Sequence, residues 1–314
     1  MKQRVLTGSA LIAFLILLFF SKQVTPFVFD AFVVLLASYA GFEMSCMLRK
    51  IGMYNNKWCI IFYPVVSYAL YKICVAQNIN LYISFVMQIA LVILISAAVA
   101  LVGVIFKKAT ENEVKTRKLK ISVEQFSLFK GVQTLFGLLY PGFIVMLLLV
   151  LNNLNSLNNW FVKYNGFGNE MSIFFLVLTF VIPVFVDTFA MLTGSLFKGP
   201  KLCPNISPKK TVSGAIGGFV WGTVCSVALF FIFNSINPFM TIFIDLNLTW
   251  WKVLIVGGVA SIFCQFGDIF ESFIKRKAGV KDSGDFLPGH GGILDRIDSH
   301  IVSIIIVFIF MLVL

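Results

Sequence analysis

The chain has 314 residues, of which 59% are hydrophobic and 12% are charged, and its formal net charge is +11. A soluble domain carries about twice that charged fraction, so the composition excludes an ordinary soluble protein. Several apolar runs approach the roughly 20 residues with which a helix crosses a bilayer. The sequence therefore predicts an all-α, polytopic integral membrane protein.

The first apolar run, 5–21, follows Lys2 and Arg4 and so has the basic start of a signal peptide. No cleavage site of small residues follows, because the chain continues as Lys22-Gln-Val-Thr-Pro26. We interpret the run as a retained first helix rather than as a cleaved leader.

Eight further runs are predicted to span the membrane, which makes about nine spans in all. They are 27–48, 58–76, 82–106, 131–151, 171–191, 213–234, 250–272 and 299–314. The stretch 236–249 is also apolar, but it is too short and too rich in Asn to be predicted as a span.

The Lys and Arg residues alternate between the predicted connections. Twenty of the 25 lie before the first span or in the second, fourth, sixth and eighth connections, and the other connections hold one lysine each. Loops rich in Lys and Arg stay cytoplasmic, so we expect a cytoplasmic N-terminus. Topology and attraction to anionic lipid explain the net charge better than nucleic acid does, and no nucleic-acid partner is expected.

In the sixth connection and the span before it lies a first candidate phosphate site. Asp187 is deep in the apolar run 171–191, four residues after Pro183. The segment Ser207-Pro-Lys-Lys-Thr then places Lys209 and Lys210 beside hydroxyl groups and a helix start flanked by glycines, where a phosphate could bind. A Lys-Lys pair before a membrane helix is also common without any such role, and that alternative stays open.

Acidic residues gather around the eighth connection. Asp268 lies at the end of one apolar run, Asp295 and Asp298 precede the last run, and Asp282 lies between them. Clustered carboxylates repel one another unless a cation lies among them, and ligands that are all oxygen suit Mg²⁺. We expect Asp268, Asp295 and Asp298 to bind Mg²⁺, with a second cation as an option, and Asp282 to support them.

Groups that suit phosphate lie in the same connection. Glycines let backbone amides approach a phosphate, and a histidine can donate to one. The set is Lys275, Arg276, Lys281, His290, Gly291, Gly292 and Arg296. Acids for a metal interleaved with bases for phosphate are what nucleotidyl or phosphoryl transfer requires. The alternative is a loop at the membrane surface whose charges pair with each other and with lipid headgroups.

These residues resemble the signature of the phosphatidate cytidylyltransferases, also called CDP-diacylglycerol synthases. That signature reads S-x-x-K-R, then K-D, then P-x-H-G-G-x-x-D-R-x-D. It is matched by Ser272, Lys275, Arg276, Lys281, Asp282, Pro288, His290, Gly291, Gly292, Asp295, Arg296 and Asp298. Gly267-Asp268 and Ser207–Thr211 match two further family elements. The chain departs from the family at Val212–Gly214, where W-E-G is usual, and at Met191, where a tyrosine is usual.

The resemblance implies transfer of CMP from CTP to phosphatidic acid, with CDP-diacylglycerol and pyrophosphate as products. It implies catalytic roles for Asp268, Asp282, Asp295 and Asp298. Substrate contacts are expected from Asp187, Ser207, Lys209, Lys210, Lys275, Arg276, Lys281, His290, Gly291, Gly292 and Arg296. We assign 171–314 to the catalytic part of one integrated membrane domain, and 1–170 to helices that face lipid or form a homodimer.

The compact chain with short loops suggests a bacterial plasma membrane protein whose active site faces the cytoplasm. Three alternatives remain. A transporter would distribute polar residues along several spans, often in repeated halves. A CDP-alcohol phosphotransferase would show D-G, two residues, then A-R, which the chain lacks. A cytidylyltransferase for another lipid phosphate would carry the same signature.

Overall fold

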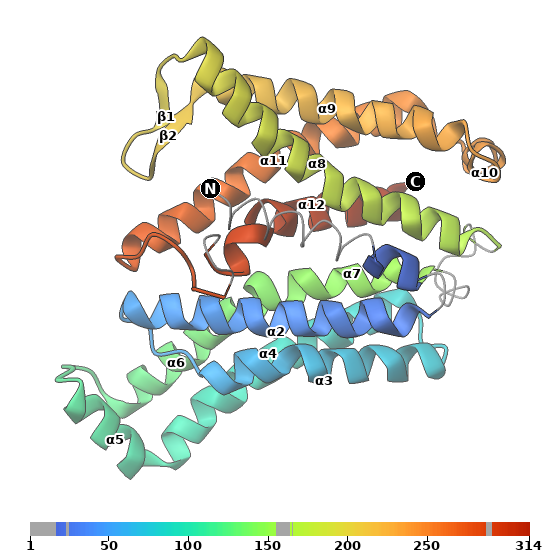
Figure 1. The fold of residues 1–314 in the computed structure, drawn as a ribbon. Coiled ribbons are helices and arrows are strands. Elements are labelled where there is room, and N and C mark those ends of the chain that lie inside the picture. Colours follow the sequence, from blue (N-terminus) through green and yellow to red (C-terminus); the bar gives the residue numbers. More distant parts are fainter. Residues whose placement is uncertain (1–16, 23–24, 155–163, 165, 287–290) are drawn as a thin grey trace.

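The computed structural model describes residues 17–22, 25–154, 164, 166–286 and 291–314, and these are helical almost throughout (Figure 1). Over the described residues, eight segments are long and apolar enough to cross a membrane. The all-α membrane fold expected from the composition is confirmed.

The elements follow one another along the chain in a simple order. Residues 17–22 are helical, and the later helices are α2 (Pro26–Lys50), α3 (Lys57–Ala76), α4 (Leu81–Ile105), α5 (Lys107–Thr116), α6 (Val123–Gly137), the π-helix η1 (Leu138–Phe143), α7 (Ile144–Asn152), α8 (Gly168–Phe197), α9 (Val212–Asn234), α10 (Phe239–Asp245), α11 (Trp250–Lys277) and α12 (Leu294–Val313). The strands β1 (Lys201–Cys203) and β2 (Ser207–Thr211) form an antiparallel hairpin between α8 and α9.

Each predicted run after the first overlaps one observed span. The run 5–21 lies mostly outside the described residues, so a count of nine stays a prediction. Several observed helices extend beyond the runs, because polar residues at a membrane surface lower the local hydropathy without ending the helix. The span of α8 continues to Phe197, and α12 begins at Leu294, which places Asp295 and Asp298 in its first turns.

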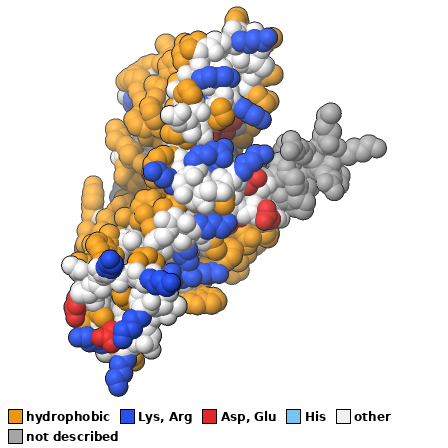
Figure 2. All heavy atoms as spheres, turned by 90° about the vertical axis from the view of Figure 1, so that its left-hand side faces the viewer, with side chains coloured by type: hydrophobic (Ala, Val, Ile, Leu, Met, Phe, Trp, Pro, Cys, Tyr) orange, Lys and Arg blue, Asp and Glu red, His pale blue; other side chains and the backbone are white. Residues whose placement is uncertain are grey.

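The spanning helices lie side by side, and their connections alternate between two ends of the molecule (Figure 1). The connections that follow α2, α4, α8 and α11 lie at one end, which we call the basic end. Figure 2 shows this end with Lys and Arg side chains gathered over it. The predicted grouping of cations is therefore observed among the described residues, and its assignment to the cytoplasm stays a prediction.

One buried core joins the N-terminal and C-terminal parts of the chain. Met44 of α2, Leu148 of α7, Phe175 of α8 and Val307 of α12 are all fully buried in it. The last helix packs against α2, α7, α8 and α11, so it lies at the centre of the helix assembly. The start of α12 is therefore held in place by elements from both parts of the chain.

The helices α11 and α12 touch through a glycine next to the predicted site. A Cβ atom on Gly267 would lie 2.7 Å from the backbone oxygen of Asp298, which is closer than real Cβ atoms come. Only glycine therefore allows the two helices to approach at this point. This contact sets how near Asp268, the next residue on α11, lies to Asp298.

A Gly267→Ala substitution is expected to lower stability by about 1–3 kcal/mol, because the added methyl group must push α12 away. The loss would be measured as a lower unfolding temperature of the purified protein in detergent. Gly258→Ala on the same helix is the matched control, since its Cβ would lie 3.6 Å from the nearest atom. Equal effects of the two substitutions would contradict the close contact.

Candidate active site

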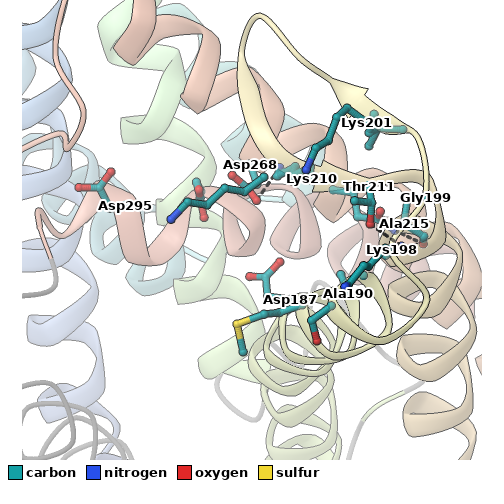
Figure 3. Close-up of a pocket in the computed structure, with 18 of the residues that line it drawn as sticks. Asp187, Ala190, Lys198, Gly199, Lys201, Lys210, Thr211, Ala215, Asp268 and Asp295 are labelled. Atoms are coloured by element: carbon teal, nitrogen blue, oxygen red, sulfur yellow. Dashed lines mark hydrogen bonds and ion pairs between the residues drawn. The ribbon is translucent and has the colours of Figure 1, made fainter. Parts of the chain in front are cut away.

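A cavity of about 700 Å³ opens at the basic end between α8, the β1–β2 hairpin, α9, α11 and α12 (Figure 3). Its lining combines small residues, cations and acids. The charged members are Asp187, Lys198, Lys201, Lys209, Lys210, Asp268, Lys275, Asp282, Asp295, Arg296 and Asp298. Residues 90 or more positions apart in sequence thus face one space.

Asp268 pairs with a lysine from the hairpin. Its Oδ2 lies 2.6 Å from Nζ of Lys210, and the hydroxyl of Ser272 donates to Oδ1 over 3.4 Å. Figure 3 shows Asp268 and Lys210 side by side within the cavity. Both side chains of the pair remain partly exposed, at 28% and 24%. A cation can therefore approach the Asp268 carboxylate, whereas the ammonium nitrogen of Lys210 is itself buried here and would have to turn to meet a phosphate.

The hairpin that carries Lys210 is anchored at both ends. At its tip, Nε of Arg276 on α11 donates to the backbone oxygen of Ile206 over 3.1 Å. At its base, the Thr211 hydroxyl accepts from the amide of Gly214 over 3.1 Å and caps α9. Arg276 thus holds the hairpin over the cavity through the backbone.

Lys275 joins α11 to α12 through two carboxylates. Its ammonium group lies 2.5 Å from Oε2 of Glu271, one turn away on α11, and 2.6 Å from Oδ1 of Asp295 on α12. Glu271 is fully buried, and the Asp295 and Lys275 side chains are 6% and 11% exposed. Two buried acids therefore share one lysine at this point.

Asp295 holds the connection between α11 and α12. Its Oδ2 accepts from the amide of Ser283 over 2.8 Å, from the Ser283 hydroxyl over 2.9 Å and from the amide of Gly292 over 2.8 Å. Gly291 has φ +82°, and a Cβ atom there would lie 2.6 Å from the same oxygen. The glycines of the signature therefore allow the backbone to wrap around this carboxylate.

Asp298 and Asp187 face the same cavity from α12 and α8. Asp298 is 8% exposed, and its Oδ1 accepts from the amide of Ser299 over 2.7 Å. The Ser299 hydroxyl donates to Oδ2 of Asp187 over 3.4 Å. The buried carboxylate of Asp298 has no lysine partner among the described residues, which is costly in a membrane protein and usually marks function, whereas Asp187 is exposed toward the cavity.

Most of the predicted site residues lie around this cavity. Those that line it are Asp187, Lys209, Lys210, Asp268, Lys275, Asp282, Asp295, Arg296 and Asp298. Those that lie outside its lining are Ser207, Arg276, Lys281, Gly291 and Gly292. His290 lies outside the described residues, so its predicted contact stays a prediction.

The three predicted metal ligands are not gathered into one group. In the described residues, no three His, Cys, Asp or Glu side chains lie close enough together to hold a metal ion by themselves. Asp268 pairs with Lys210, and Asp295 pairs with Lys275. Figure 3 shows Asp268 and Asp295 apart in the cavity. Mg²⁺ commonly takes one or two protein carboxylates plus waters and phosphates, so the oxygen donors lining this cavity fit it in that mode.

Three residues near the site were not assigned from the sequence. Glu43 and Ser283 hold the α11–α12 connection. Tyr140 is 9% exposed, and its hydroxyl has no hydrogen-bond partner among the described residues. Its ring packs edge-on against Phe270 of α11, with centroids 5.3 Å apart. The sequence signal for Glu43 was an acidic residue within an apolar run. No pattern in the sequence indicated that Tyr140 lies near the site.

The sequence of the chain is similar to those of known proteins. A sequence model described as the cytidylyltransferase family matches residues 2–314. A protein of Staphylococcus haemolyticus named phosphatidate cytidylyltransferase is 43% identical over 125 residues, which are 40% of this chain and 44% of that protein. A relative with the same name in Rickettsia conorii is 41% identical over 43% of this chain and 56% of that protein. Another, in Staphylococcus epidermidis, is 39% identical over 52% of this chain and 64% of that protein. The matches thus span less than two thirds of each relative.

Proposed function

The chain belongs to the cytidylyltransferase family, and from this premise we propose that it transfers CMP from CTP to phosphatidic acid, forming CDP-diacylglycerol and releasing pyrophosphate. The names of its bacterial relatives support this substrate pair. The observation that carries the proposal is the cavity at the basic end, where lysines of β2 and α11 alternate with carboxylates of α11 and α12.

The proposed reaction joins two anions. An oxygen of the lipid phosphate attacks the α-phosphorus of CTP and forms a P–O bond. The bond from that phosphorus to the oxygen bridging to the β-phosphate breaks, and pyrophosphate leaves with its electron pair. A phosphomonoester has a second pKa of about 6, so it is already anionic near neutral pH and needs no strong general base. Charge neutralisation and alignment are therefore the main demands on the protein.

The chain meets the demand for neutralisation from two sides of the cavity. Lys209 and Lys210 approach on the hairpin, and Lys275 and Arg296 approach on α11 and α12. Lys275 lies between two carboxylates and Lys210 pairs with Asp268, and each lysine would turn from an acid to a phosphate that enters the cavity. Arg276 does not line the cavity; its side chain supports the hairpin by donating to the backbone oxygen of Ile206.

We propose that Mg²⁺ binds at Asp268 and Asp298 together with oxygens of the triphosphate. Asp295 would join them once Lys275 turns to a phosphate. The ion would neutralise charge on CTP and orient it, as a Lewis acid does in nucleotidyl transfer. A second cation and a role for Asp282 remain part of the proposal.

The membrane setting fits a lipid substrate. The protein is integral to a membrane, and the cavity opens at the charged end of its spans, where lipid phosphates lie. We propose that this end faces the cytoplasm, where CTP occurs, and that the membrane is a bacterial plasma membrane. Formation of a homodimer stays a prediction.

A polar cluster at the opposite end of α2 does not favour a transporter. There Asp30 is fully buried, and its oxygens accept from Asn152 over 2.9 Å and Asn153 over 2.7 Å. Lys72 lies 2.9 Å from its Oδ2, and the Tyr68 hydroxyl donates to it over 3.3 Å. The carboxylate is thus saturated by its neighbours, which is typical of a structural cluster.

The proposed function is tested by pyrophosphate release from the purified protein in detergent. We expect release to require CTP, phosphatidic acid and a divalent cation together. Replacing phosphatidic acid by diacylglycerol should abolish it, because the attacking oxygen is missing. Release with another lipid phosphate and none with phosphatidic acid would favour a related cytidylyltransferase instead.

Lys210→Met is expected to raise the KM for CTP by about ten- to a hundredfold, because a charge-assisted hydrogen bond to phosphate is worth about 1.5–3 kcal/mol. The measurement is initial rate against CTP concentration at saturating lipid. Lys118→Met is the matched control, since this lysine lies in the connection after α5, away from the cavity lining. A KM raised equally in both variants would show only a general effect of charge.

A further inference from the structure

A charged residue of α2 contacts the connection that carries the signature. Glu43 is 2% exposed and lies among apolar and small residues of α2. One oxygen, Oε1, accepts from the amide of Ile293 over 3.0 Å. The other, Oε2, accepts from the amide of Leu294 over 2.7 Å and from the hydroxyl of Ser283 over 3.0 Å. Every one of these donors belongs to the last forty residues of the chain.

The connection packs against Glu43 through glycines. A Cβ atom on Gly292 would lie 2.5 Å from both carboxylate oxygens, and one on Gly284 would also meet the carboxylate. Tyr39, one turn earlier on α2, packs against Phe286 with ring centroids 4.6 Å apart and the rings tilted by 53°. Figure 1 shows the α11–α12 connection reaching down to α2. The fit is therefore specific to a carboxylate at this position.

Glu43 and the site share a residue. Ser283 gives its hydroxyl to Glu43 or to Asp295, and its amide to Asp295. Asp295 in turn pairs with Lys275. The amides of Ile293 and Leu294 begin α12, and a helix N-terminus favours a negative group beside it. Glu43 thus fixes both the start of α12 and the serine that holds Asp295.

We propose that Glu43 is a positioning residue, through which α2 sets the geometry of the catalytic connection by binding Ser283 and the first amides of α12. The proposal rests on the proposed function for its kinetic part only. It assigns a task in the reaction to a helix that contributes nothing to the signature. Glu43 touches no substrate; it acts through Asp295 and through the direction of α12, which carries Asp298.

The structural part is tested by hydrogen–deuterium exchange of the full-length protein in detergent. In Glu43→Gln the side-chain NH₂ group replaces one of the two oxygens that accept from the amides of Ile293 and Leu294, so these first amides of α12 lose protection. We expect exchange there to be at least about tenfold faster, with α8 amides unchanged. Glu124→Gln is the matched control, since Glu124 is an exposed glutamate. Unchanged exchange in Glu43→Gln would overturn the proposal.

The kinetic part is tested by pyrophosphate release per folded molecule. We expect Glu43→Gln to lower kcat by about 10–100-fold and to change the KM for CTP little, as is typical when a group that orients ligands is lost. A merely structural role would reduce the yield of folded protein and leave kcat unchanged. That result would overturn the positioning role.

A double-mutant cycle with Ser283→Ala separates coupling from independent damage. Glu43 and Ser283 act through one contact, so the two effects on kcat should combine to clearly less than their product. Multiplication of the two effects would contradict the shared contact.

If Glu43→Gln does not fold, Gly284→Ala is the alternative variant, because its added methyl group meets the same carboxylate. The same losses of amide protection and of kcat are expected of it. If the unaltered enzyme releases no pyrophosphate, the proposed function fails, while the exchange result still decides whether Glu43 holds the connection.

Discussion

Asp268→Asn is expected to lower turnover by about 10²–10³-fold while the protein still inserts and folds. The substitution removes the negative charge of a carboxylate that we propose as a ligand of the bound cation, and it keeps the size of the side chain. The Asn amide oxygen can still accept from the ammonium group of Lys210, so the protein should still fold although the ion pair is lost. The measurement is the rate of pyrophosphate release at saturating CTP and phosphatidic acid.

Asp245→Asn is the control for this substitution. Asp245 ends α10, at the opposite end of the spans, and its side chain is exposed. The activity of the Asp245→Asn variant should stay within about twofold of that of the unaltered enzyme, as is typical of surface substitutions. Near-normal turnover of Asp268→Asn would remove this carboxylate from the catalytic assignment.

Lys275→Met is expected to cause the largest loss of stability, about 3–5 kcal/mol. The substitution leaves Glu271 and Asp295 buried beside each other without their shared cation. The effect would be measured as a lower unfolding temperature in detergent and as a lower fraction of monodisperse protein. Adding Glu271→Gln to the same chain should recover part of the loss, because it removes one of the two unpaired charges.

The control for Lys275→Met is Lys107→Met. Lys107 lies 3.8 Å from Glu124, and both side chains are about 60% exposed. An exposed pair of this kind is worth about 0–1 kcal/mol, so unfolding should change little. Equal destabilisation by the two substitutions would contradict the buried network around Lys275.

Much of the site could be predicted because its parts are local in sequence. The spacing of Asp268 and Lys275 along one helix, and of Asp295 and Asp298 along another, requires only helical periodicity. The alternation of cations then places Ser207–Thr211 at the same end as these helices. Local patterns were therefore enough to bring the hairpin, α11 and α12 to one end of the molecule.

The pairing of individual charges could not be predicted in the same way. No pattern in the sequence predicts that Lys210 forms an ion pair with Asp268, or that Lys275 lies between Glu271 and Asp295. Convergence of the carboxylates on one ion stays a prediction, and among the described residues Asp268 and Asp295 each face a lysine. Which partner a charge takes depends on distances set by helix packing, such as the contact at Gly267.

The contact between Glu43 and Leu294 shows a second limit. It joins residues 251 positions apart. A buried glutamate in an apolar run indicates that some partner exists, but one sequence does not identify that partner. The break at Tyr140, between α6 and α7, is similar: the run 131–151 reads as continuous, whereas the backbone there leaves the helical region at φ −119° and ψ 113°.

The central claim is that the cavity at the basic end binds CTP with a divalent cation held by acids of α11 and α12. A crystal structure with CTP and Mn²⁺, located by its anomalous scattering, tests it most directly. We predict an ion bonded to the carboxylate of Asp268 or Asp298 and to a triphosphate oxygen, with Lys210 turned toward the nucleotide. An ion and nucleotide bound outside this cavity, with the Lys210–Asp268 and Lys275–Asp295 pairs unchanged, would contradict it.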